Sequence, residues 1–162
     1  MIRRNAEQKR MMTVLNVFGV AYDPTNASSV SDIYDSRITE GTERGFTVFR
    51  EKETGQTAIE LSGSGFQSTI AVVVALKDDT ISGFRVVSQS ETPGLGSRIA
   101  EEPFQKQFIG KKVSDGISYT KGGNAGDSEF DAITGATESS KALARILDSG
   151  FRLYFGASKQ GN

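Results

Sequence analysis

Thr137 stands at a place in the sequence where an anion could be held. It ends the segment Asp131-Ala-Ile-Thr-Gly-Ala-Thr137, which follows a strand-like stretch and opens a helical one. The first amides of a helix have no partner within the helix, and the helix dipole adds partial positive charge there, so a phosphate is stabilised at that position. The hydroxyl of Thr137 therefore has two interpretations. It is the attachment atom of an anion site, or it is an N-cap that accepts from the amide of Ser139 or Ser140.

A second loop, Ser90-Glu-Thr-Pro-Gly-Leu-Gly96, is rich in groups that can donate hydrogen bonds. Pro93 fixes one backbone angle, while Gly94 and Gly96 permit left-handed conformations. A loop of this kind exposes backbone N–H groups beside side-chain hydroxyls, which suits a ligand rich in acceptor atoms. The alternative interpretation is an ordinary Pro-Gly turn.

The composition removes many other kinds of chemistry. The chain has 162 residues, the size of one domain, and contains no Cys and no His. Thiolate nucleophiles, imidazole bases, iron–sulfur clusters, His-ligated haem and most zinc sites are therefore excluded, and redox chemistry would need an added organic cofactor or a carboxylate site. The 19 basic residues are balanced by 20 acidic ones, so no basic excess favours nucleic acid as a partner.

The pattern of the first 26 residues predicts a helix, and no apolar run of the chain is long enough to span a membrane. The longest apolar run of the chain is Ile70–Leu76, far short of the roughly 20 residues that cross a bilayer. Basic residues crowd the first half of the N-terminal segment, between Arg3 and Arg10. They are typical of a solvated helix face, or of a stalk that leaves a membrane.

The remaining pattern predicts an α+β fold, a twisted and mainly antiparallel sheet packed with helices. We expect an N-terminal helical segment over 1–26, one domain over 27–155 and a polar tail over 156–162. The expected elements are a helix over 2–20, a turn-rich linker over 23–29, a hairpin of strands 46–50 and 57–61, a central strand over 69–77, a strand over 81–89 with a bulge at Gly83, two short helices over 98–110 broken at Pro103, strands over 113–119 and 130–133, and a last helix opening at Thr137.

Together and in this order, with Thr92 45 residues before Thr137, the two loops resemble one family closely. It is the FMN-binding domain of the covalent-flavin subunits, which are the C subunit of the sodium-pumping NADH:quinone oxidoreductase (Nqr) and the G subunit of the Rnf complex. The resemblance covers residues 40–155 and is carried by Gly63-Ser-Gly-Phe66, Ile70-Ala-Val-Val-Val74, Ile81-Ser-Gly-Phe84, Ser90–Gly96 and Asp131–Ser140. The last fills every fixed position of the family's flavin-transfer signature. The segments 63–70 and 5–19 resemble the C subunit of Nqr more than the G subunit of Rnf.

The resemblance implies a covalently bound FMN. A separate flavin transferase would take FMN from FAD and esterify its phosphate to Thr137. The family's Glu-Thr-Pro-Gly-Leu-Gly loop, which binds the flavin ring, implies contacts from Glu91, Thr92, Leu95 and Gly96. Around the phosphate the implied residues are Thr134, Gly135 and Ala136, with Ser140 and Lys141 nearby.

The resemblance also implies the complex in which the chain acts and its location in the cell. The chain would relay electrons in an ion-translocating NADH:quinone or NAD:ferredoxin oxidoreductase, beside the other membrane subunits of the Nqr or Rnf complex. It would be a soluble domain on the periplasmic, outer side of the bacterial inner membrane, with the anchor absent from this chain and no turnover by the isolated domain. Two alternatives stay open: a noncovalent FMN-binding reductase domain, and a cofactor-free scaffold module of a membrane complex.

Overall fold

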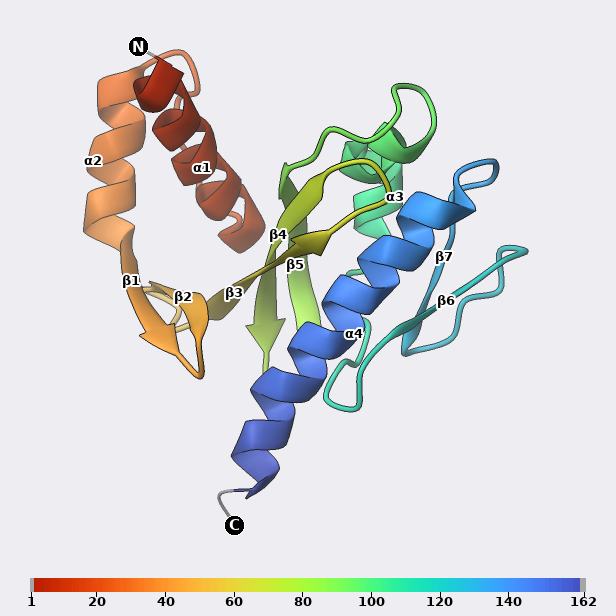
Figure 1. Cartoon of the computed structure of the whole chain (residues 1–162). Helices are drawn as coiled ribbons and strands as arrows, with labels where there is room; N and C mark the ends of the chain where they lie inside the picture. Colours follow the sequence, from red (N-terminus) through yellow and green to blue (C-terminus); the bar gives the residue numbers. More distant parts are fainter. Residues whose placement is uncertain (1, 161–162) are drawn as a thin grey trace.

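The chain folds into an antiparallel sheet with helices on both faces (Figure 1). The computed structural model describes residues 2–160, with side chains over 5–156. The elements are α1 (Ile2–Phe18), α2 (Ala27–Arg37), β1 (Ile38–Glu43), β2 (Phe46–Glu51), β3 (Thr57–Ser64), β4 (Thr69–Lys77), β5 (Thr80–Ser88), the 3-10 helix η1 (Gly96–Ala100), α3 (Glu102–Lys106), β6 (Ser118–Thr120), β7 (Glu129–Asp131) and α4 (Thr137–Gln160).

The main sheet has the strand order β1-β2-β3-β4-β5, with every neighbouring pair antiparallel. The predicted hairpin is confirmed as β2 and β3, and β4 has a neighbour on each side. A register shift in β5 opposite Ala75 and Leu76 confirms the irregularity expected near Gly83. The short strands β6 and β7 pair in parallel away from this sheet. The predicted α+β class with a mainly antiparallel sheet is therefore confirmed.

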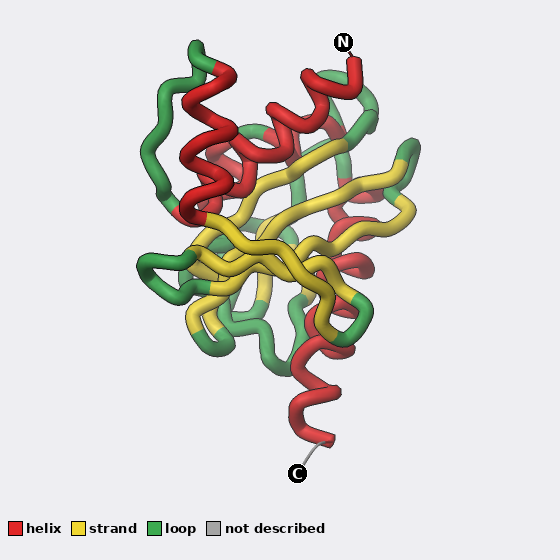
Figure 2. Tube along the Cα trace, turned by 90° about the vertical axis from the view of Figure 1, so that its left-hand side faces the viewer, coloured by secondary structure: helices red, strands yellow, loops and turns green. Residues whose placement is uncertain are grey.

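Each face of the sheet covers its own apolar core. In β4, Ile70, Val72 and Val74 pack into the core beneath α4, whereas Val73 and Ala75 pack into the core beneath α1 and α2. Successive side chains of a strand point to opposite faces, so a strand covered on both sides reads as a continuous apolar run. Figure 2 shows the C-terminal end of α4 projecting beyond the sheet.

The N-terminal helix is packed against the sheet by specific contacts. Arg10 forms ion pairs with Glu40 at 3.2 Å and Glu60 at 3.6 Å, and its guanidinium lies 5.0 Å from the centre of the Phe49 ring. At least this member of the basic cluster therefore belongs to the fold, while the side chains of Arg3 and Arg4 lie outside the described residues. No helix within residues 2–160 is long and apolar enough to cross a membrane.

Several stretches differ from their predictions. Ile38–Glu43 forms strand β1, which is not among the expected elements. The two short helices are separated at Glu101, and Pro103 lies in the first turn of α3, where a proline is tolerated. Residues 27–37 form α2 although most of this stretch was not expected to be helical, because only Val30 and Tyr34 are buried and apolar periodicity is weak. The strand expected over 113–119 shrinks to β6 at Ser118–Thr120. The last helix continues to Gln160, into the segment expected as a polar tail.

Candidate functional site

A cavity of about 340 Å³ lies at the start of α4, between the two loops singled out in the sequence. It brings together six of the predicted site residues and three further ones. The predicted residues are Thr92, Leu95, Gly96, Gly135, Ala136 and Thr137, and the additional ones are Phe66, Glu138 and Ser139.

Thr137 is the first residue of α4 and is partly buried at the wall of this cavity. Within the described part of the chain its hydroxyl makes no hydrogen bond, so the N-cap bond to Ser139 or Ser140 is not formed. The amides of the first helical residues lack an intrahelical partner by geometry. Gly135 precedes them at φ +82°, with open space where a Cβ would stand. A free hydroxyl and unpaired donors therefore share one accessible turn.

The segment that leads to Thr137 is tied down on its inner side. The Gln107 side chain clamps the backbone of Asp131, accepting from its N–H at 2.7 Å and donating to its carbonyl at 3.2 Å. The Ser140 hydroxyl accepts from the Ile133 N–H at 3.0 Å and is fully buried. Ser140 therefore faces the loop and does not line the cavity.

Glu91 is buried behind the cavity wall, with only 3% of its surface exposed. Its carboxylate accepts from the Phe66 N–H at 2.8 Å, the Gln67 N–H at 2.9 Å, and the hydroxyls of Ser68 and Ser139, each at 2.8 Å. Burial by itself raises the pKa of Glu91, but these hydrogen bonds outweigh it and leave the pKa below its ordinary value. The carboxylate is thus ionised and fully used by the protein.

The two glycines of the second loop have different roles. Gly94 adopts φ +75°, the left-handed conformation that the sequence permits. Gly96 does not have a positive φ and is instead packed against α4, because a Cβ there would collide with the Ser139 hydroxyl. Its smallness allows the loop to touch the start of the helix.

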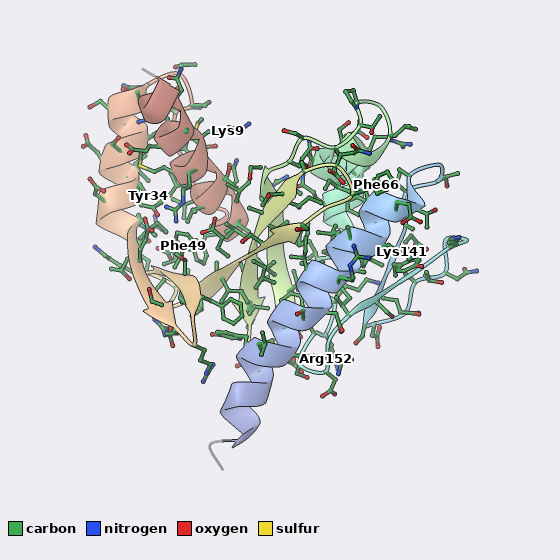
Figure 3. The ribbon with its side chains drawn as sticks, viewed as in Figure 1. Lys9, Tyr34, Phe49, Phe66, Lys141 and Arg152 are labelled. Atoms are coloured by element: carbon green, nitrogen blue, oxygen red, sulfur yellow. The ribbon has the colours of Figure 1, made fainter. Side chains whose placement is uncertain are left out.

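Two exposed apolar side chains line the cavity. Phe66 is 56% exposed and Leu95 is 46% exposed, although both are large and apolar. Phe66 comes from the turn between β3 and β4 and lies beside the first turns of α4 (Figure 3). Side chains of this kind gain from contact with an apolar ligand surface. Phe66 was not among the predicted site residues, although a lone aromatic residue in the polar turn Gly65–Ser68 was a usable signal.

The charges around the cavity are few. None of the described lining residues is basic, and Glu138 is the one charged residue among them. Lys141 lies one turn after Thr137, with its ammonium 3.9 Å from the Glu138 carboxylate, and does not line the cavity. Thr134 is exposed and lines a different cavity, beside Arg98 and Phe104.

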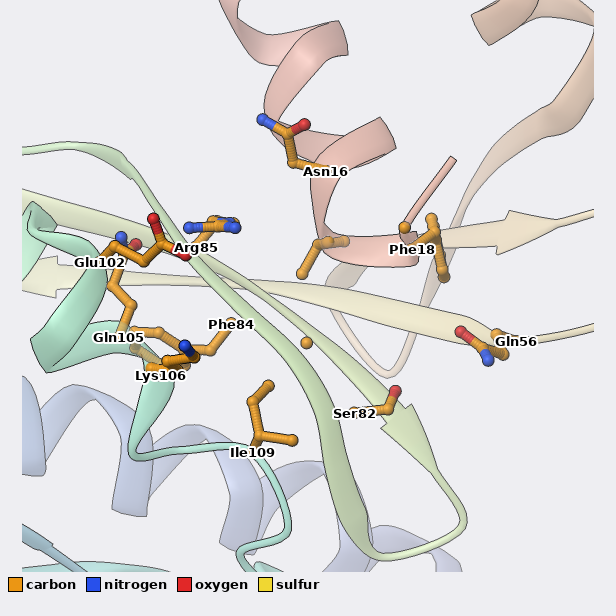
Figure 4. Close-up of a pocket in the computed structure, with 13 residues that line it drawn as sticks. Asn16, Phe18, Gln56, Ser82, Phe84, Arg85, Glu102, Gln105, Lys106 and Ile109 are labelled. Carbon is orange, nitrogen blue, oxygen red and sulfur yellow. The ribbon is translucent and has the colours of Figure 1, made fainter. Parts of the chain in front are cut away.

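A separate cavity of about 310 Å³ lies between the end of α1, strand β5 and helix α3 (Figure 4). It contains Arg85, Glu102 and Lys106, and the Ser82 hydroxyl is buried there without a partner among the described residues. None of the predicted site residues lines it, so it is distinct from the cavity at Thr137.

The fold is that of solved structures of the C subunit of Na(+)-translocating NADH-quinone reductase. The structure of the C subunit of Na(+)-translocating NADH-quinone reductase from Parabacteroides distasonis matches with a TM-score of 0.75 and 22% identity, covering 94% of this chain and 90% of that chain. Shewanella oneidensis NqrC matches with a TM-score of 0.74 and 17% identity, covering 99% and 100%. At these identities the likeness establishes the fold.

Sequence comparison establishes the family. The family model described as FMN-binding domain matches residues 65–151, more than half of the chain. The G subunit of the ion-translocating oxidoreductase complex of Methanosarcina acetivorans is 34% identical over 150 residues, which are 88% of this chain and 72% of that protein. The C subunit of the Na(+)-translocating NADH-quinone reductase of Haemophilus ducreyi is 34% identical over 117 residues, 67% of this chain and only 44% of that protein. The chain belongs to the FMN-binding domain family, as the resemblance of its two loops predicts.

Proposed function

We propose that this chain carries one FMN, joined by a phosphoester bond to the Thr137 side-chain oxygen, and relays electrons in a complex of the Nqr or Rnf type. One observation carries the proposal. A threonine hydroxyl without a hydrogen-bond partner among the described residues stands at a helix N-terminus, in a cavity that also presents Phe66 and Leu95.

The charges of the cavity fit an esterified phosphate. Free FMN presents a phosphate dianion, which noncovalent sites commonly hold with Arg or Lys. The described lining residues include no such side chain, so the N-terminal amides and dipole of α4 must hold the anion. A phosphodiester carries a single negative charge, and its covalent bond supplies the retention that ion pairs would otherwise provide. This balance favours the covalent form over the noncovalent alternative.

The apolar walls fit a flavin ring that stays partly exposed. Cavities that enclose small ligands range from about 300 to 1,000 Å³, and the 340 Å³ here is near the lower limit. Phe66 and Leu95 can contact the ring while its edge remains at the surface. FMN supplies the chemistry of accepting and releasing single electrons, and the protein supplies orientation and solvent control. An exposed edge suits transfer to a neighbouring redox centre.

Attachment requires an accessible hydroxyl and a flavin transferase. A bond forms between the Thr137 oxygen and the FMN phosphorus of FAD, the bond from that phosphorus to AMP breaks, and the hydroxyl proton passes to a base of the transferase. Gly135 keeps the approach to Thr137 open, because nothing lies within 4 Å of a Cβ at that position. Gln107 and Ser140 hold the segment from behind and leave its outer side free.

The complex and its location are part of the same proposal. Proteins similar to this chain are named as subunits of ion-translocating oxidoreductases, so the partners we propose are the other membrane subunits of such a complex. The domain would lie on the periplasmic, outer side of the membrane, with residues 1–26 as the juxtamembrane segment. Relatives from Nqr and Rnf complexes have similar identities, 31–34% and 32–34%, and do not separate the two complexes.

The experiment is coexpression with a flavin transferase that modifies a known acceptor in parallel. The intact mass of the wild-type protein should rise by FMN minus water, and Thr137→Ala should abolish the increase. Thr92→Ala removes another hydroxyl of the same cavity and should keep the adduct. A wild-type mass that stays unchanged contradicts the proposal. Flavin released by boiling in acid supports the noncovalent alternative, and copurification of partner subunits without any flavin supports the scaffold alternative.

A further inference from the structure

One carboxylate joins three segments that are far apart in the sequence. Oε1 of Glu91 accepts from the Phe66 N–H and the Ser139 hydroxyl, and Oε2 accepts from the Gln67 N–H and the Ser68 hydroxyl. Glu91 thus connects the turn after β3, its own loop before η1, and the start of α4. The last of these carries Thr137 two residues before Ser139.

The Phe66 side chain depends on this connection for its position. With 56% of its surface exposed, it has little packing of its own to hold it. Its turn is closed by the Gly65 N–H, which donates to the Ser68 carbonyl at 2.6 Å, and by the Ser68 hydroxyl, which accepts from the Ser90 N–H at 2.9 Å. Toward α4, the hydrogen bonds of the turn run through Glu91. The end of β3 also packs on α4, where Gly63 lies against Ile146, but the hydrogen bonds from the turn itself to the start of α4 run through this one side chain.

The ionised form is the one that fits all four donors. A carboxylate is acceptor-only, whereas an amide of the same shape has one oxygen and one NH₂ group. The Ser68 and Ser139 hydroxyls can turn to accept from an NH₂, but the backbone N–H groups of Phe66 and Gln67 have no such freedom. A glutamine at this position therefore leaves one of those two amides facing a donor. The lowered pKa of Glu91 agrees with a carboxylate that stays charged.

We propose that Glu91 is a positioning residue of the flavin site, which fixes the Phe66 turn to the start of α4 and thereby sets how the ring is covered. The ring contact implied for Glu91 by its loop is replaced by an indirect role, because the carboxylate is buried and already holds four donors. The inference rests on the proposed function for its effect on the cofactor. The network itself belongs to the protein without flavin.

The first test uses the flavin-free protein. In Glu91→Gln, hydrogen exchange at the Phe66 or Gln67 amide should be about 10- to 100-fold faster, the factor expected when a hydrogen bond to a charged group is lost. Ser139→Ala removes one donor and should give a smaller change at Phe66. Unchanged exchange at both amides in Glu91→Gln overturns the proposal.

Glu51→Gln is the matched control. Glu51 is 1% exposed and also accepts four hydrogen bonds, from Arg37, the Glu53 amide, and the amide and hydroxyl of Thr54, but it lies at the end of β2. Loss of this carboxylate should leave hydrogen exchange at the Phe66 amide unchanged, although it destabilises the protein. Equal acceleration at Phe66 in both variants would show a general loss of stability and overturn the positioning role.

The second test uses the flavinylated protein. Two properties of its flavin are measured, the circular dichroism in the visible range and the midpoint potential. Removing cover from the ring favours the charged reduced form, so Glu91→Gln and Phe66→Ala should both raise the potential. The double variant should match Phe66→Ala alone, because Glu91 acts through Phe66. Additive shifts, or no shift in Glu91→Gln, overturn the proposal. If the wild-type protein carries no adduct, the proposed function fails while the exchange experiment still tests the network.

Discussion

Gly96→Ala tests the contact between the Pro-Gly loop and the start of α4. The new Cβ would collide with the Ser139 hydroxyl and lie 2.9 Å from the Cβ atoms of both Glu91 and Ser139. These neighbours belong to buried backbone-anchored segments, so they can yield only by moving the loop away from the helix. Because Gly96 lacks a positive φ, the cost is steric and not conformational.

The magnitude follows from two contributions. Overpacking a buried contact costs about 1–3 kcal/mol. Displacement of Ser139 also weakens its hydrogen bond to the ionised Glu91, an interaction worth about 1.5–3 kcal/mol when lost completely. Since the loss here is partial, we expect about 2–4 kcal/mol in the free energy of unfolding. For a chain of this length that lowers Tm by roughly 5–15 °C.

Urea and thermal unfolding of the flavin-free protein provide the assay. Gly41→Ala is the control, because its φ is not positive and its Cβ would meet nothing within 4 Å, and it should change stability by less than about 0.5 kcal/mol. Adding Gly96→Ala to Ser139→Ala should cost less than in the wild type, since the nearest colliding atom is gone. A Gly96→Ala protein as stable as the control would refute the contact.

Three further predictions concern other parts of the chain. Burial alone would raise the pKa of Glu51, but hydrogen bonds from Arg37 and the following turn outweigh it and lower the pKa to about 2 from 4.5. Its stabilisation is complete above pH 4.5 and is lost as the pH falls toward 2, so Glu51→Gln should flatten the acid side of the unfolding free energy. Gly83→Ala places a Cβ against the Val17 carbonyl, which should cost about 1–3 kcal/mol and expose α1 to limited proteolysis. Ser140→Ala leaves a buried amide unpaired and should cost about 1–3 kcal/mol in urea unfolding without preventing flavin attachment, as intact mass would show.

The sequence predicts the sheet well where strands are buried. The β2–β3 hairpin and β4 have apolar residues that a sheet must bury, and their positions follow directly. The helix α2 was missed because it buries few side chains, although Asn26 caps it by accepting from the Ser29 N–H. In the stretch before β6, Gly116 has φ +96° and bends the chain out of strand geometry. Short exposed elements bury few side chains, so the spacing of apolar residues shows no clear period over them.

The sequence predicts which loops meet, but not the direction in which each side chain points. Loop patterns placed Thr137, Thr92 and Leu95 near one another, because both loops follow strands and meet at the start of α4. The inward direction of Glu91 depends on a turn 25 residues earlier, at Phe66, which no local pattern encodes. Long-range hydrogen bonds of this kind become visible only in the folded chain.

Localisation of the flavin within the peptide that contains Thr137 shows whether the phosphoester forms at this residue. Protein coexpressed with the transferase would be digested and its fluorescent peptide fragmented by mass spectrometry. We expect a riboflavin phosphate on the Thr137 side chain and unmodified Thr134, Ser139 and Ser140 in the same peptide. A flavin on any other residue, or a flavin lost intact on denaturation, would rule out covalent attachment at Thr137.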